Sequence, residues 1–187
     1  MKLNKLKKEI VKDNNNLVLF LPGLSLNLDF QNSSPYINRF AKEINYNLFI
    51  YTYDFQITDN FNLTLTDCIN ELQDLLTELK KKYSKIIVFA KSFSGFLINF
   101  IKTDLQHVFL LGPAINIGKR MDYNQKLKDI SMKEITIQEE DVIKDSTFIV
   151  GEFDTFNIKY SKTIPIHIIK GEGHTFKNQN NSKKYSI

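Results

Sequence analysis

A serine, an aspartate and a histidine each follow a short apolar run in this chain of 187 residues. Ser92 comes two residues after the run IIVFA, Asp154 four residues after FIV, and His174 five residues after IPIHII. A histidine that is oriented by a carboxylate can take the proton of a serine hydroxyl, which makes the serine a nucleophile. These residue types therefore predict attack by Ser92 on a carbonyl carbon.

The residues around Ser92 are small enough for a sharp turn from a strand into a helix. Such a turn brings the backbone close at the positions two before and two after the nucleophile. Ala90 and Ser94 occupy these positions for Ser92, whereas a nucleophile at Ser94 would have bulky Phe96 two residues later. We therefore predict Ser92 as the nucleophile, and the alternative is an ordinary serine cap at the start of a helix.

Two backbone amides are candidates to stabilise a negatively charged substrate oxygen. The amide of Phe93 lies at the start of the helix that follows Ser92, where it can donate to an oxyanion. The second candidate lies in Pro22-Gly23-Leu24, directly after the run LVLFL. Because proline has no N–H, the donor there is Gly23 or Leu24. The alternative is a plain turn that ends a strand.

Asp154 and His174 each have competitors in the sequence. Glu152 lies close to Asp154, and aspartate is also common as a turn residue or a helix cap. Of the three histidines, His107 begins an apolar run and His167 lies inside one, so we expect both to be structural. His174 follows a strand end in the glycine-flanked loop GEGHTF, and its alternative role is that of a solvated loop residue.

The elements that must position these residues alternate along the chain. Apolar runs predict strands at 17–21, 48–53, 86–90, 108–111, 148–150 and 164–169, and helical patterns predict helices at about 34–45, 64–82 and 93–101. Near-continuous apolar strands that alternate with helices predict a mostly parallel, doubly wound α/β sheet with helices on both faces. Functional residues in such sheets lie in the loops at the carboxyl ends of the strands.

Length and composition restrict the classes of protein. A mass of 21.8 kDa and 42% hydrophobic residues predict a single domain over residues 1–187, with residues 1–16 and 177–187 peripheral. Residues 1–12 form an edge strand, in a hairpin through three asparagines, or a short helix, and residues 112–145 cannot be assigned. No apolar run reaches the roughly 20 residues of a membrane span. We expect no secretory signal, and a single cysteine excludes a disulfide framework, so we expect a cytoplasmic protein.

The positive charge lies at the ends of the chain. The net charge is +4, of which residues 1–13 and residues 177–187 carry +3 each, which leaves −2 for the body. The chain has two arginines, Arg39 and Arg120, although arginine is the residue favoured for bidentate contacts to phosphate and bases. This distribution argues against a dedicated nucleic-acid surface.

Five segments together resemble the α/β-hydrolase superfamily, in which the triad order is serine, acid, histidine. They are FLPGLSLN, VFAKSFSGF, LLGPA, IVGEFD and IKGEGHTF, and they extend from residue 20 to residue 176. The resemblance implies Ser92 as nucleophile, His174 as base, Asp154 as its orienting acid, and the amides of Leu24 and Phe93 as the oxyanion hole. It implies a compact α/β-hydrolase fold with little or no cap domain.

The segments also depart from the family pattern. Pro22-Gly23 replaces the usual His-Gly, and Ala90 and Ser94 replace the two outer glycines of the turn. Lys91 before the serine resembles small cytosolic hydrolases whose turn is Gly-Lys-Ser-Met-Gly-Gly, a dienelactone-hydrolase-like branch. The tail after His174 is short for the family.

The function implied is that of a serine hydrolase that cleaves a carboxylic ester or thioester through an acyl-enzyme, without a metal or an organic cofactor. The expected partner is a small-molecule or carrier-bound acyl substrate, with no nucleic acid and no membrane span. Two alternatives stay open: a non-catalytic binding protein with this fold, and an acyltransferase that uses the same three residues. The identity of the acyl group and the oligomeric state are not determined by the sequence.

Overall fold

The computed structural model describes residues 6–23, 26–53, 64–114, 116–117, 135–154 and 163–176. The strands of the main sheet are β1 (Leu6–Ile10), β2 (Asn16–Leu21), β3 (Asn47–Tyr51), β4 (Lys85–Lys91), β5 (His107–Leu111), β8 (Ser146–Gly151) and β9 (Ile166–Ile169). The helices are α1 (Leu26–Glu43), α3 (Leu65–Lys80), α4 (Phe93–Leu97) and the short 3₁₀ helices η2 (Ile98–Phe100) and η4 (Glu139–Asp141). A separate pair, β6 (Asn116–Ile117) and β7 (Ile135–Thr136), is antiparallel.

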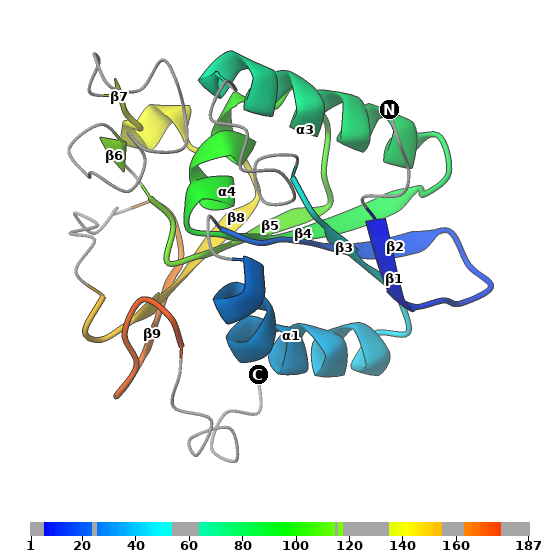
Figure 1. Cartoon of the computed structure of the whole chain (residues 1–187), viewed down its shortest axis with the longest axis horizontal. Coiled ribbons are helices and arrows are strands. Elements are labelled where there is room, and N and C mark those ends of the chain that lie inside the picture. Colours follow the sequence, from blue (N-terminus) through cyan, green and yellow to red (C-terminus); the bar gives the residue numbers. More distant parts are fainter. Residues whose placement is uncertain are drawn as a thin grey trace.

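The main sheet has seven strands in the order β1-β3-β2-β4-β5-β8-β9 (Figure 1). β1 is antiparallel to β3, and every other neighbouring pair in this sheet is parallel. The helices α3 and α4 cover one face and α1 covers the other (Figure 1). The predicted fold class, a mostly parallel sheet with helices on both faces, is therefore confirmed.

The strand order changes direction at β2, which lies between β3 and β4. The chain leaves β2 for β3 on one side and then crosses to β4 on the other. Loops that leave neighbouring parallel strands in opposite directions open a crevice at the carboxyl edge of the sheet, and ligands bind there. The two loops that border this crevice begin at Pro22 after β2 and at Ser92 after β4.

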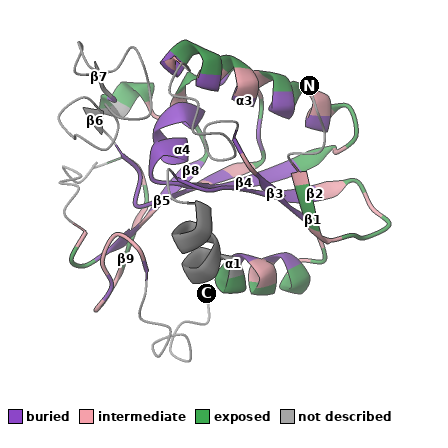
Figure 2. Ribbon diagram, in the orientation of Figure 1, coloured by how far each residue is buried: buried purple, intermediate pink, exposed green. Residues whose placement is uncertain are grey.

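The core is divided into two layers by the alternation of side chains along the strands. On β2, Leu17, Leu19 and Leu21 pack in the cluster that contains α3 and α4. Val18 and Phe20 point the other way and pack in the cluster that contains α1. All five are fully buried, and the central strands are buried along their length (Figure 2). Each side chain of this size contributes about 1.5–3 kcal/mol by burial, so β2 anchors both layers.

The predicted helix at 64–82 is confirmed as α3, and Thr64 caps its N-terminus. The Thr64 side chain accepts a hydrogen bond from the Asp67 amide, and the Asp67 carboxylate accepts one from the Thr64 amide, which makes a capping box. The predicted helix at 93–101 is shorter, because α4 ends at Leu97 and continues as η2.

The expected start of the first helix at Ser34-Pro35 is wrong. The helix α1 begins at Leu26 and contains Pro35. A proline has no backbone N–H to donate and is disfavoured inside a helix. In α1, which packs on the sheet, this local cost does not make the helix begin at Pro35. The end is close to the expected Asn45, which has φ 56°. The amide of Tyr46 donates to the Ala41 carbonyl at 2.9 Å, which is a Schellman termination.

The N-terminal segment forms an edge strand, which is one of the two predicted alternatives. The hairpin expected with this strand is wrong. β1 pairs with β3 and not with β2, which follows it in sequence. The buried Asn47 explains the arrangement, because its side-chain oxygen accepts from the Lys12 amide at 2.7 Å. Its side-chain nitrogen donates to the carbonyls of Asn14 and Asn16 at 3.1 and 2.8 Å. The connection between β1 and β2 is thus tied to the start of β3.

We predict that Asn47→Ala lowers the free energy of unfolding by about 2–4 kcal/mol, because buried backbone groups lose their partners. Urea denaturation measures this change. The matched control is Asn70→Ala on the exposed side of α3, which should change stability by less than about 0.5 kcal/mol. Equal effects of the two substitutions would contradict this account of β1.

Candidate active site

Ser92 lies at the turn between β4 and α4, in a conformation that residues other than glycine rarely adopt. Its φ is 49° and its ψ is −110°. Such a backbone costs about 1–3 kcal/mol and persists only where the surroundings impose it. Here the Ser92 amide donates to the Leu111 carbonyl at 3.0 Å, and the Ser92 carbonyl accepts from the amides of Ala114 at 3.0 Å and Phe96 at 3.2 Å. Hydrogen bonds from β5, its following loop and α4 therefore hold the turn.

Small residues make this turn possible, as the sequence predicts. A Cβ on Gly95 would lie 2.8 Å from the Pro113 Cβ and 3.2 Å from the Ala90 carbonyl oxygen. Ala90 and Ser94 are both fully buried. The first turn of α4 is thus packed directly against the strand end and against the loop after β5.

The structure brings the three predicted residues together. His174 Nε2 lies 3.0 Å from Ser92 Oγ, and His174 Nδ1 lies 3.2 and 3.1 Å from the two carboxylate oxygens of Asp154. The Asp154 side chain is 3% exposed and the His174 side chain 26% exposed. A carboxylate that accepts from Nδ1–H leaves the lone pair of Nε2 facing the serine hydroxyl. This arrangement can move a proton from Ser92 to His174.

Lys91 links the loop that contains His174 to β4, the strand that precedes Ser92. Its side chain is fully buried, its ammonium donates to the backbone carbonyl of His174, and it lies 4.8 Å from the ring centroid of Phe176. Phe176 itself is buried in the cluster that contains α1. Lys91 therefore contacts the loop at the histidine and again two residues later.

Glu152, the competitor of Asp154, has a different position. Its carboxylate accepts a hydrogen bond from the Gly171 amide at 2.9 Å, so Glu152 stabilises the loop before His174. The loops after β8 and β9 are also joined by a bond from the Phe153 amide to the Glu172 carbonyl at 2.8 Å. A Cβ on Gly151 would lie 2.5 Å from that same carbonyl oxygen, so this contact requires glycine.

Gly112 is a residue of the site that the sequence reasoning missed. It follows β5 with φ +46°, and a Cβ there would lie 2.7 Å from Asp154 Oδ2, 3.2 Å from His174 Nδ1 and 3.2 Å from Lys91 Nζ. All three groups thus crowd around the space beside this glycine. The segment LLGPA contained the signal, because a glycine directly after a strand marks a position where backbone and side chains approach closely.

The other predicted residues have the following positions. Phe93 is the first residue of α4, whereas Leu24 lies outside the described residues. His107 Nε2 lies 3.0 Å from Thr147 Oγ1, and burial lowers the pKa of its imidazole. His167 is exposed on β9. Both histidines lie on strands and not in the loops that carry Ser92 and His174, and the structural roles expected of them stay predictions.

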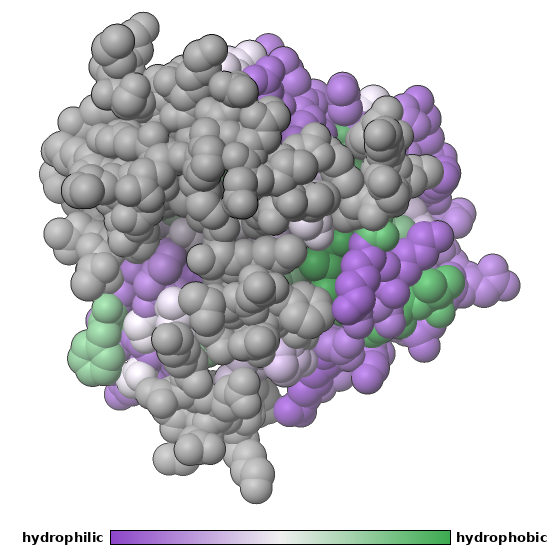
Figure 3. Space-filling view, in the orientation of Figure 1, coloured by the Kyte–Doolittle hydropathy of each residue, from purple (hydrophilic) through white to green (hydrophobic). Residues whose placement is uncertain are grey.

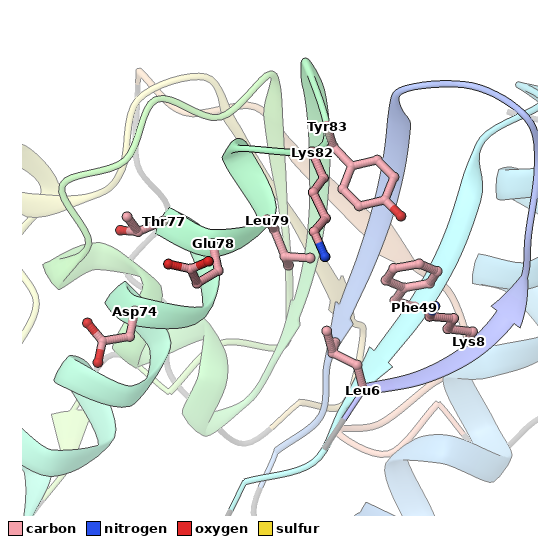
Figure 4. Close-up of a pocket in the computed structure, with 9 residues that line it drawn as sticks. All are labelled: Leu6, Lys8, Phe49, Asp74, Thr77, Glu78, Leu79, Lys82 and Tyr83. Carbon is pink, nitrogen blue, oxygen red and sulfur yellow. The ribbon is translucent and has the colours of Figure 1, made fainter. Parts of the chain in front are cut away.

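A groove of about 680 Å³ lies elsewhere, between α3 and the edge formed by β1 and β3 (Figure 4). It is lined by Leu6, Lys8, Phe49, Asp74, Thr77, Glu78, Leu79, Lys82 and Tyr83. Hydrophobic side chains show on the described surface near the end of the molecule that carries β1 and again on the opposite side, and the rest of the described surface in this view is mostly hydrophilic (Figure 3). No predicted site residue lines this groove.

The described residues contain neither a cluster of metal-ligating side chains nor a membrane-spanning helix. No group of three or more His, Cys, Asp or Glu side chains in the described ranges is placed to hold a metal ion. In the same part of the chain, no helix has the length and apolar character needed to cross a membrane.

Comparison with known proteins rests on structure alone. No protein-family model matches the sequence, and no curated protein matches it significantly. The chain is similar to the carboxylesterase CesB of Bacillus subtilis, with 11% identity, a TM-score of 0.59, and coverage of 96% of this chain and 84% of that one.

Two further similar structures have related descriptions. A structure from a study of carboxylesterases of the thaumarchaeon Nitrososphaera gargenis has 11% identity and a TM-score of 0.61, with coverage of 95% of this chain and 90% of that one. The enzyme MGS-MChE2, an alpha/beta hydrolase from a sediment metagenome, has 14% identity and a TM-score of 0.60, with coverage of 95% and 91%. At these identities the likeness establishes the fold.

We predict that Gly112→Ala displaces the Asp154–His174 pair, because the new methyl group would overlap the Asp154 carboxylate. The positive φ adds strain, so the free energy of unfolding should fall by about 1–3 kcal/mol, as measured by urea denaturation. Gly173→Ala is the matched control. A Cβ at Gly173 would have its nearest neighbour, the Phe153 carbonyl oxygen, at 4.0 Å. The free energy of unfolding of this variant should therefore stay close to that of the wild-type protein.

Proposed function

We propose that this chain, whose fold is that of the α/β-hydrolases, is a serine hydrolase that cleaves carboxylic esters or thioesters through an acyl-enzyme on Ser92. One observation carries the proposal. The hydroxyl of Ser92, in a strained turn at the carboxyl end of β4, lies 3.0 Å from His174 Nε2, whose other nitrogen contacts the buried carboxylate of Asp154. Each of the three comes from a different strand-end loop.

In the first half of the reaction, Ser92 Oγ attacks the carbonyl carbon while its proton moves to His174 Nε2. Asp154 stabilises the imidazolium that forms. The amide of Phe93, directly after the nucleophile, and that of Leu24 donate to the oxyanion of the tetrahedral intermediate. The intermediate collapses, the bond to the alcohol or thiol breaks, and the leaving group takes the proton from His174.

In the second half, water replaces the leaving group. His174 takes a proton from the water as the water oxygen attacks the acyl carbon, and a second oxyanion forms in the same place. When this intermediate collapses, the bond to Ser92 Oγ breaks and the serine recovers its proton from His174. The products are a carboxylic acid and an alcohol or thiol, and Ser92 is regenerated.

Two further observations support the ester and thioester class. The similar structures described above include carboxylesterases, and these have the same fold. The mechanism requires a nucleophile, a base and an acid. His174 lies within hydrogen-bond distance of Ser92 through one ring nitrogen and of Asp154 through the other, which supports these roles for the three residues. We propose a cytoplasmic location, since Cys68, the single cysteine of the chain, is a buried free thiol. We also propose that the substrate is a small or carrier-bound acyl compound.

We predict that Ser92→Ala and His174→Ala each lower kcat for short-chain 4-nitrophenyl esters and acyl thioesters by about 10³–10⁶-fold, because either change removes proton transfer from the nucleophile. The thermal unfolding midpoint measures whether the fold is kept. His167→Ala is the matched histidine control, since His167 is exposed on β9, and it should leave kcat unchanged.

Three results would contradict this assignment. Activity that survives Ser92→Ala but not Ser94→Ala would identify Ser94, and not Ser92, as the nucleophile. A folded protein with no turnover and no reaction at Ser92 would favour a binding protein with this fold. Acyl transfer to an added alcohol or thiol in preference to water would identify an acyltransferase that uses the same three residues.

A further inference from the structure

A buried hydroxyl network lies behind the turn, at the position where the family pattern has glycine. Ser94 and Tyr53 are both fully buried. Ser94 Oγ makes a hydrogen bond to the backbone carbonyl of Pro22 and lies 2.9 Å from the Tyr53 hydroxyl. The network therefore joins the first turn of α4 to the ends of β2 and β3, three elements that are far apart in sequence.

The directions of these hydrogen bonds follow from the number of protons. A serine hydroxyl has one hydrogen, and a carbonyl oxygen can only accept. Ser94 therefore donates to Pro22 and accepts from Tyr53. Burial raises the pKa of the Tyr53 phenol above its usual value, so the tyrosine keeps the proton that it donates. Hydrogen bonds in a chain of this kind strengthen one another in a low-dielectric interior.

The Pro22 carbonyl belongs to the backbone segment that must supply the second oxyanion donor. A peptide unit is planar, and in its trans form the carbonyl oxygen and the following N–H point to opposite sides. A bond that fixes the Pro22 oxygen toward Ser94 therefore turns the Gly23 N–H away from Ser94. Rotation of this peptide would break the bond to Ser94 and change the direction of the Gly23 N–H.

We propose that Ser94 is a positioning residue of the oxyanion hole: its hydroxyl holds the Pro22 carbonyl and so fixes the Pro22–Gly23 peptide, which begins the segment proposed to supply the second donor. This inference rests on the proposed function. It also gives a reason for serine at this position, because glycine would satisfy the turn but would provide no donor to Pro22. Tyr53 supports Ser94 by its hydrogen bond to the Ser94 hydroxyl.

The test compares Ser94→Ala and Ser94→Gly, which both keep the small size that the turn requires. A misplaced oxyanion donor acts in the transition state, so kcat for a 4-nitrophenyl ester should fall by about 10–100-fold with KM within about twofold. The pH dependence of kcat should keep its midpoint, because Asp154 and His174 are untouched. Tyr53→Phe should lower kcat less than either substitution, because Ser94 can still donate to Pro22.

The matched control is Ser146→Ala. Ser146 is also a buried serine, but it lies at the start of β8, at the opposite edge of the sheet from Ser92. The variant Ser146→Ala should have the kcat of the wild-type protein. A second measurement is independent of turnover: loss of the hydrogen bond should move the ¹³C resonance of the Pro22 carbonyl upfield in Ser94→Ala and leave it in place in Ser146→Ala.

The outcomes separate the two proposals. If the original protein turns over esters and Ser94→Ala and Ser94→Gly keep its kcat, the positioning role is overturned while the hydrolase stands. An equal loss of kcat in Ser146→Ala also overturns it, because the loss would then follow from stability. If the original protein neither hydrolyses esters nor reacts at Ser92, the proposed function falls, and the positioning role falls with it.

Discussion

The backbone turn at Ser92 is the constraint on which the rest of the site depends. A φ of 49° on a residue with a Cβ is held against a cost of about 1–3 kcal/mol, and it is held by the loop after β5 as well as by α4. The same loop contains Gly112, whose missing side chain leaves room for Asp154 and His174. One short connection thus fixes the nucleophile and makes space for its partners.

The order of strands explains why these parts meet. β2 and β4 are neighbours in the sheet although α1, β3 and α3 separate them in sequence. The loops that follow them therefore border one crevice, where the Ser94 hydroxyl reaches the Pro22 carbonyl. On the other side, β5, β8 and β9 bring Gly112, Asp154 and His174 to the same edge, and Lys91 joins the histidine loop to β4. Parallel pairing alone places all these loop starts along one line.

The sequence was sufficient for the features that depend on local pattern. Buried strands such as IIVFA and the capped helix after Thr64 have unmistakable composition, and the small residues around Ser92 distinguish it from Ser94. Features that depend on distant contacts were missed or wrong. Pairing of β1 with β3 depends on Asn47, the start of α1 is not set by Pro35, and the roles of Gly112 and Lys91 appear only when four strand ends meet. The oxyanion role of Leu24 stays a prediction, because Leu24 lies outside the described residues.

The central claim is that Ser92 is activated by His174, and reaction with a fluorophosphonate tests it without knowledge of the substrate. This reagent phosphonylates a serine that has a base beside it and donors for the developing negative charge. We expect one adduct per chain, mapped by peptide mass spectrometry to Ser92 and absent in His174→Ala. A folded protein that forms no adduct, or forms it on another serine, would contradict the account.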